Sequence, residues 1–134
     1  MNAKVDFDAL TPKQKDKTAD DYLWDAQCRL EALGGMLLRT VVSYEQRNLS
    51  EMGTKVLFTL NTCLAEYAVE DIESAMGLSS SPHLQRTYQK ALGILTALVE
   101  ASNLDLAKTY TCTLLHGLFT ITELLNEEIG TITL

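Results

Sequence analysis

The sequence predicts an all-α protein, an up-down bundle of about four long helices arranged as two helical hairpins and preceded by a flexible N-terminal arm. The 134 residues include only 7 glycines and 2 prolines, which favours few, long elements over many short strands. Apolar residues recur at helical spacings of three and four. A length of 134 residues suits one domain with its own core.

Residues 1–17 are predicted to form the flexible arm and residues 18–134 the helical-bundle domain. The arm holds lysines and aspartates in similar number and shows no sustained helical period. The first helix is expected to begin near Thr18, whose hydroxyl can cap the first turn while Asp21 completes a reciprocal pair. Gly34 and Gly35 lie inside this helix, where they are expected to permit close helix approach or a bend. Its predicted buried stripe is Leu23, Ala26, Leu30, Leu33, Leu37, Val41 and Tyr44.

The second helix is predicted to follow a break at residues 47–51. Asn48 is the expected cap, with Glu51 at the reciprocal position, and Gly77 the expected left-handed stop. Its predicted buried stripe is Met52, Val56, Leu60, Cys63, Tyr67, Ile72, Ala75 and Met76.

The second hairpin is predicted to begin at Pro82, a residue suited to the first position of a helix. The third helix is expected to end near Ser102 and Asn103, with Ser102 and Asp105 as a capping pair for the fourth. The fourth helix is expected over residues 104–129, although residues 109–114 alternate like a strand and leave that alternative open. The predicted stripes are Leu84, Tyr88, Ala91, Leu92, Leu95, Leu98 and Val99, and then Leu104, Ala107, Thr111, Leu114, Leu118, Ile121, Leu125 and Ile129.

Cysteine usage and hydropathy predict a cytoplasmic location. Cys28, Cys63 and Cys112 are odd in number and lie within apolar periodic segments, so they are interpreted as reduced thiols of the core. The first residues contain no apolar signal-peptide core, and no apolar run approaches the ~20 residues of a membrane helix.

A net charge of −7 disfavours direct nucleic-acid binding and suits a basic protein partner. In an up-down bundle the second and fourth helices end at the same pole, which would collect many acids. Negative charge at helix C-termini runs against the macrodipole, and such positions can mark function. The predicted partner-binding residues are Glu66, Glu70, Asp71, Glu73, Glu123, Glu127 and Glu128. The competing interpretation is a set of ordinary solvated helix ends.

Motifs for catalysis, cofactors or metals are not found in the sequence. It contains no nucleophile elbow and no phosphate loop, and neither His83 nor His116 follows a glutamate at the spacing used by dinuclear metal bundles. The alternative function is a divalent-metal-dependent enzyme like the all-α nucleotide pyrophosphatases. Glu66, Glu70 and Glu73 share one helical face, which suits half of such a site, but the other helices offer no matching acids.

The sequence therefore predicts a non-enzymatic protein–protein interaction module, a small acidic regulator, adaptor or inhibitor that binds a basic partner through its acidic pole. A homodimer whose copies complete each other's core is one form that such a module can take. No cofactor, nucleic acid or membrane is expected among its ligands.

Overall fold

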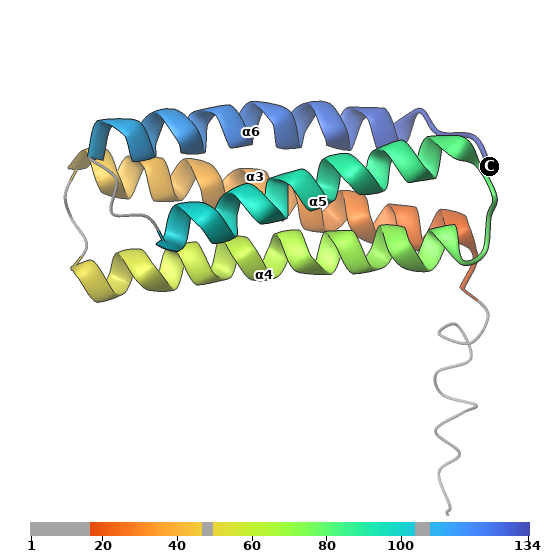
Figure 1. Ribbon diagram of the computed structural model, residues 1–134, viewed down its shortest axis with the longest axis horizontal. Helices are drawn as coiled ribbons and strands as arrows, with labels where there is room; N and C mark the ends of the chain where they lie inside the picture. Colours follow the sequence, from red (N-terminus) through yellow and green to blue (C-terminus); the bar gives the residue numbers. More distant parts are fainter. Residues whose placement is uncertain (1–16, 47–49, 104–107) are drawn as a thin grey trace, which may run out of the picture.

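The computed structural model describes residues 17–46, 50–103 and 108–134, and this part of the chain forms an up-down bundle of four helices (Figure 1). The predicted fold class is confirmed. The helices are α3 (Ala19–Gln46), α4 (Glu51–Met76), α5 (Pro82–Asn103) and α6 (Lys108–Gly130).

Each helix packs mainly on two neighbours. α3 and α5 each lie against both α4 and α6, so α4 and α6 occupy diagonal positions in the bundle. Figure 1 shows the C-terminal ends of α4 and α6 at the same end as the N-terminal ends of α3 and α5. This end is called the acidic pole below, because the acids of the predicted partner-binding set lie on the last turns of α4 and α6.

The start of α3 matches the predicted capping pair. The Thr18 amide donates to Asp21 Oδ2 at 3.0 Å, and the Asp21 amide donates to Thr18 Oγ1 at 3.2 Å. Lys17, the last residue of the predicted arm, precedes this helix, and its side chain packs against the first turns: its Nζ is 2.6 Å from Asp25 Oδ2 and 5.1 Å from the ring centroid of Tyr22. The rest of the predicted arm, residues 1–16, lies outside the described residues.

The predicted core stripe of α3 is confirmed from Leu23 to Val41, and Tyr44 is half-buried. α3 continues through the glycine pair without a break. A Cβ atom at Gly34 would lie 3.5 Å from the Phe119 ring of α6, whereas one at Gly35 would meet nothing. The predicted close approach of a neighbouring helix therefore occurs at Gly34 and not at Gly35. Even at position 34, an alanine would make an ordinary van der Waals contact with Phe119.

The predicted buried face of α4 is wrong over the first four turns. The side chains predicted to be buried are exposed, with Met52 at 70%, Val56 at 51%, Leu60 at 45% and Tyr67 at 51%, and Cys63 is exposed as well. The core side chains of this stretch are instead Phe58, Asn61 and Ala65, followed by Ala68 and Val69. Ile72 and Ala75 are buried as predicted, and Met76 is partly buried. Ala65 and Ala68 are fully or almost fully buried. Phe58 meets Tyr44 edge-on at a centroid distance of 6.2 Å.

Both predicted ends of α4 need correction. Ser50 is the N-cap, because its hydroxyl accepts the Gly53 amide at 3.1 Å; the predicted cap, Asn48, lies outside the described residues. Gly77 follows the last residue of the helix as predicted, but its φ of −68° is right-handed. Its amide donates to the Glu73 carbonyl at 3.1 Å, so the helical turn closes without a left-handed residue.

The second hairpin begins at Pro82, as predicted. Leu84, Ala91 and Leu98 are buried, whereas Val99, predicted to join them, is exposed. α5 ends at Asn103. The Ser102 hydroxyl donates to the Val99 carbonyl at 2.8 Å; Asp105, its predicted capping partner, lies outside the described residues.

Residues 109–114 are helical, so the strand alternative is wrong. The described helix starts at Lys108, and the predicted start at residue 104 lies outside the described part of the chain. Thr111, Leu118, Leu125 and Ile129 are buried as predicted. Ile121 is exposed, and the buried face of α6 includes Leu115 and Thr122 in its place.

The thiols do not form part of the core. Cys28 and Cys63 are exposed and Cys112 is half-buried, so the prediction of core thiols is wrong for the first two. Cys28 and Cys63 each lie two residues away from the nearest buried positions of their helices. Over the described ranges, no helix is long and apolar enough to cross a membrane.

Candidate functional site

The acids of the predicted partner-binding set fall into two classes. Asp71 and Glu128 each lie beside a cation, whereas the others are exposed and make no ion pair with any described residue. The unpaired acids are Glu66, Glu70 and Glu73 on α4, and Glu123 and Glu127 on α6. The two paired acids contribute to the fold, and the unpaired acids remain available to a partner.

Asp71 joins α4 to α3. Arg29 Nε lies 3.5 Å from Asp71 Oδ2, and the guanidinium stands 5.1 Å from the centroid of the Tyr67 ring. The Asp71 side chain is only 16% exposed, and this burial raises the pKa of its carboxyl above the usual 3.8, against the opposing effect of Arg29. The pair therefore carries a desolvation cost that the ion pair offsets in part.

Glu128 joins α6 to α5. Lys90 Nζ lies 2.7 Å from Glu128 Oε2. The same carboxylate borders a hollow of 350 Å³ that is also lined by His83 and residues 131–133. This contact spans the least extensive of the four interfaces between neighbouring helices, that of α5 with α6. An exposed pair of this kind contributes about 1 kcal/mol or less to stability.

The unpaired acids do not form a single cluster. α4 and α6 lie diagonally across the bundle, so Glu66, Glu70 and Glu73 are separated from Glu123 and Glu127 by the intervening helices. Within residues 17–46, 50–103 and 108–134, no group of three or more His, Cys, Asp or Glu side chains is placed to hold a metal ion.

The acids of α4 border a small hollow on the outer surface of that helix. It has a volume of 170 Å³ and is lined by Cys63, Glu66, Tyr67 and Glu70. Its walls combine an aromatic ring, a thiol and two carboxylates. A lysine or arginine side chain fits this combination, because its stem can lie on apolar surface while its charge reaches the carboxylates.

A continuous apolar strip leads into this hollow. We call it the α4 strip: Met52, Val56, Leu60, Cys63 and Tyr67, all exposed. Sequence reasoning found these residues but assigned them to the core. The signal against that assignment is a second set of apolar and small residues on the opposite face, Phe58, Ala65, Ala68 and Val69, which competes with the strip for the core.

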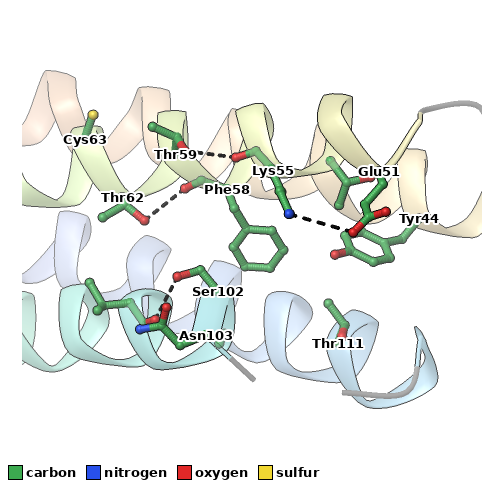
Figure 2. A pocket seen from close by; sticks show the side chains of 13 residues that line it. Tyr44, Glu51, Lys55, Phe58, Thr59, Thr62, Cys63, Ser102, Asn103 and Thr111 are labelled. Atoms are coloured by element: carbon green, nitrogen blue, oxygen red, sulfur yellow. Dashed lines mark hydrogen bonds and ion pairs between the residues drawn. The ribbon is translucent and has the colours of Figure 1, made fainter. Parts of the chain in front are cut away.

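A larger groove lies at the opposite pole, where the N-terminal half of α4 faces the C-terminal end of α5 (Figure 2). Its volume is 580 Å³. Figure 2 shows Phe58 reaching into the space between the helices and Lys55 extending along α4 toward Glu51, with 3.8 Å between Nζ and Oε1. Other lining residues are Tyr44, Thr54, Thr59, Thr62, Cys63, Val99, Ala101, Ser102, Asn103 and Thr111.

The hydroxyls of this groove mostly serve their own helices. Thr54, Thr59 and Thr62 each donate to the carbonyl four residues earlier, at 3.1, 2.9 and 2.9 Å. The Tyr44 phenol has a raised pKa, because burial disfavours its anion and the charge of Cys112 adds to the effect. No histidine is among the lining residues, so the described part of the groove holds no hydroxyl or thiol beside an imidazole base.

Comparisons with known proteins provide no relative for this chain: no family model, no curated protein and no solved structure matches it.

The burial of Asp71 predicts a specific pH dependence. Because its folded pKa is raised, the native state binds this proton more tightly than the unfolded chain. The unfolding free energy of the wild type, measured relative to Asp71→Asn, is expected to be greatest below pH 3.8 and to fall as the pH rises through 3.8 and the raised pKa. Urea denaturation of both proteins from pH 3 to 7 measures this difference. A difference that grows in favour of the wild type as the pH rises would show that Arg29 outweighs burial.

Proposed function

We propose that the protein is a non-enzymatic protein–protein interaction module, and that the outer surface of α4 is its docking surface. The observation that carries the proposal is the α4 strip with unpaired carboxylates at its C-terminal end. Contiguous exposed apolar side chains bordered by charge are typical of protein-binding surfaces.

The chemistry of this surface favours an amphipathic helix with basic residues as its partner. The α4 strip offers apolar area along one helix, which an approaching helix can cover with side chains at its own i, i+3, i+4 and i+7 positions. Glu66 and Glu70 then fix orientation by accepting a basic side chain in the hollow beside Tyr67. The α6 acids Glu123 and Glu127 lie on the diagonal helix and attract a basic partner at longer range.

A module of this size and charge suits an acidic regulator, an adaptor, or an inhibitor that occupies a basic site on its target. We further infer a cytoplasmic location, since exposed Cys28 and Cys63 are free thiols and unpaired thiols are typical of reducing compartments.

Affinity purification with mass spectrometry tests the proposed docking surface. The bait variant Glu66→Gln/Glu70→Gln is expected to retain a specific basic partner about 5- to 30-fold less well than the wild type, because it removes two exposed charge contacts of about 0.5–1 kcal/mol each. The loss should diminish at high salt, where the wild type weakens as well.

The matched control is Glu123→Gln/Glu127→Gln, which removes the same charge from the diagonal helix. It is expected to retain the partner nearly as well as the wild type. Equal retention by all three baits would contradict the assignment of the docking surface to α4, and loss with the α6 control alone would move that surface to α6.

A further inference from the structure

The α4 strip has the spacing of a helix–helix seam. Val56, Leu60, Cys63 and Tyr67 follow one another at intervals of four, three and four residues, which is the pattern by which two helices interlock along a narrow stripe. Their alignment continues through Met52, so the strip spans 16 residues and about 22 Å of helix. All of its members point away from the core of their own bundle.

The charges beside the strip are arranged with opposite signs at its two ends. Lys55 and Glu66 are 11 residues apart, about three turns, so they lie nearly in line on the same flank of α4. Glu70 stands one turn beyond Glu66. The Lys55 side chain is 70% exposed, and its contact with Glu51, at 3.8 Å, joins two highly exposed groups. Each copy of α4 therefore carries an available cation at one end and two unpaired carboxylates at the other.

We propose that a second copy of this chain docks on the α4 strip, with the two α4 helices antiparallel about a two-fold axis midway between Leu60 and Cys63. The inference rests on the proposed function, since it names a partner for that same surface. The chain as a whole is acidic, and the basic side chain that its α4 helix offers to the hollow is Lys55. In this arrangement the flank of α4 that carries Lys55, Glu66 and Glu70 faces the same flank of the second copy. Lys55 of one copy then lies at the height of Ala68 of the other. That position is between Glu66 and Glu70, at the hollow lined with Tyr67.

The antiparallel orientation follows from charge and from the apolar side chains together. A parallel two-fold pair would bring opposite flanks of the two helices together at equal heights, and Lys55, Glu66 and Glu70 all lie on one flank. Lys55 would then meet no carboxylate of the second copy. The antiparallel pair instead places Val56 opposite Tyr67 and Leu60 opposite Cys63. Apolar surface meets apolar surface from Val56 to Tyr67, while Met52 lies beyond this stretch at the height of Asp71. The contact between Lys55 and the carboxylates occurs twice in the symmetric dimer, once at each end.

Among the residues that the structure describes, the other exposed apolar side chains form no strip as long as this one. On α3, Trp24 is about 21 Å along the helix from Leu38, by the rise of 1.5 Å per residue. On α6, Ile121 and Leu124 adjoin each other but Tyr110 lies about 16 Å from Ile121 along the axis. α4 thus carries the exposed apolar surface best suited to a two-fold helix pair.

Sedimentation equilibrium of the full chain tests the proposal. The wild type is expected to sediment as a dimer of two 14.9 kDa chains in the micromolar range. Leu60→Asp is expected to raise the dimer dissociation constant by at least about 100-fold, because it places two unpaired carboxylates in the apolar seam. The matched control Leu124→Asp changes an apolar residue of α6 that is 59% exposed and should leave the dimer intact. Circular dichroism confirms that both variants fold.

A charge exchange tests the orientation. Lys55→Glu alone and Glu66→Lys/Glu70→Lys alone are each expected to weaken self-association, because each creates like charges at both ends of the seam. An equimolar mixture of these two variants should form a heterodimer, in which both ends regain opposite charges. A dimer that neither variant weakens, or a mixture that stays monomeric, overturns the antiparallel arrangement.

The outcomes for the dimer and for the proposed function are distinguishable. A wild type that remains monomeric at 100 µM overturns the dimer, and the proposed function then stands or falls on the Glu66→Gln/Glu70→Gln purification. A dimer that resists Leu60→Asp but dissociates with Leu124→Asp places self-association on α6 and overturns this inference. The purification with Glu66→Gln/Glu70→Gln then still tests whether α4 binds another protein.

Discussion

Replacing Phe58 with alanine is expected to lower the free energy of unfolding by about 3–5 kcal/mol, as the truncation of a buried aromatic side chain does. Phe58 is 6% exposed and packs edge-on against Tyr44 in the space between α4 and the other helices. Its loss removes apolar area from the core and leaves a void that the helices cannot close without shifting. Urea or thermal denaturation of the two proteins measures the difference.

Leu60→Ala is the matched control, two residues further along the same helix. Because Leu60 is 45% exposed, its truncation should change the stability of the monomer by less than about 1 kcal/mol. If the loss of stability in Leu60→Ala increases with protein concentration, the additional loss comes from the proposed dimer. If Leu60→Ala proves as costly as Phe58→Ala at low concentration, then the α4 strip is buried within the monomer, and the orientation of α4 described here is wrong.

Asn61→Asp is expected to destabilise the protein by about 3 kcal/mol or more at pH 7, because it buries a carboxylate without a cation. Asn61 is fully buried between α3 and α4. Its Nδ2 donates to Thr40 Oγ1 at 2.9 Å, and its Oδ1 has no hydrogen-bond partner. A carboxylate at this position loses the donor of Asn61 and gains no compensating group.

The pH dependence gives this prediction a second measurement. Burial should raise the folded pKa of the introduced carboxyl above its unfolded value of about 3.9. The penalty is then fully present above the raised pKa and disappears as the pH falls toward 3.9. Asn103→Asp, at the exposed C-terminal end of α5, makes the same chemical change and should cost only a few tenths of a kcal/mol. A loss of unfolding free energy in Asn61→Asp that does not change with pH would mean that water reaches the introduced carboxyl.

The sequence predicted the helices well because their signals are local. A capping pair or a proline acts within one or two turns of the chain. The structure contains both of the helix starts predicted in this way, at Thr18 with Asp21 and at Pro82. The prediction failed at both ends of α4. At its start, Asn48 and Ser50 were equally able to cap the helix, and Ser50 does so; at its end, the turn closes at Gly77 without a left-handed residue. Such alternatives differ by about 1 kcal/mol or less, which local patterns do not resolve.

The candidate site illustrates the same limit at the tertiary level. The acids of α4 and α6 were correctly placed at one pole, because helix order and direction follow from the hairpins. Their separation onto diagonal helices, and the pairing of Asp71 with Arg29 and of Glu128 with Lys90, depend on which helices become neighbours. The sequence alone therefore described one acidic surface where the structure has two.

The sequence by itself determined that this chain forms four amphipathic helices in alternating directions, since periodicity and breakers are written into short stretches of residues. Only the tertiary structure decided which face of α4 is buried. Apolar residues occupy two opposite faces of that helix, and the choice between them depends on contacts with residues distant in the sequence, such as that of Phe58 with Tyr44. That choice leaves Met52, Val56, Leu60, Cys63 and Tyr67 on the surface, and with them the surface proposed for binding.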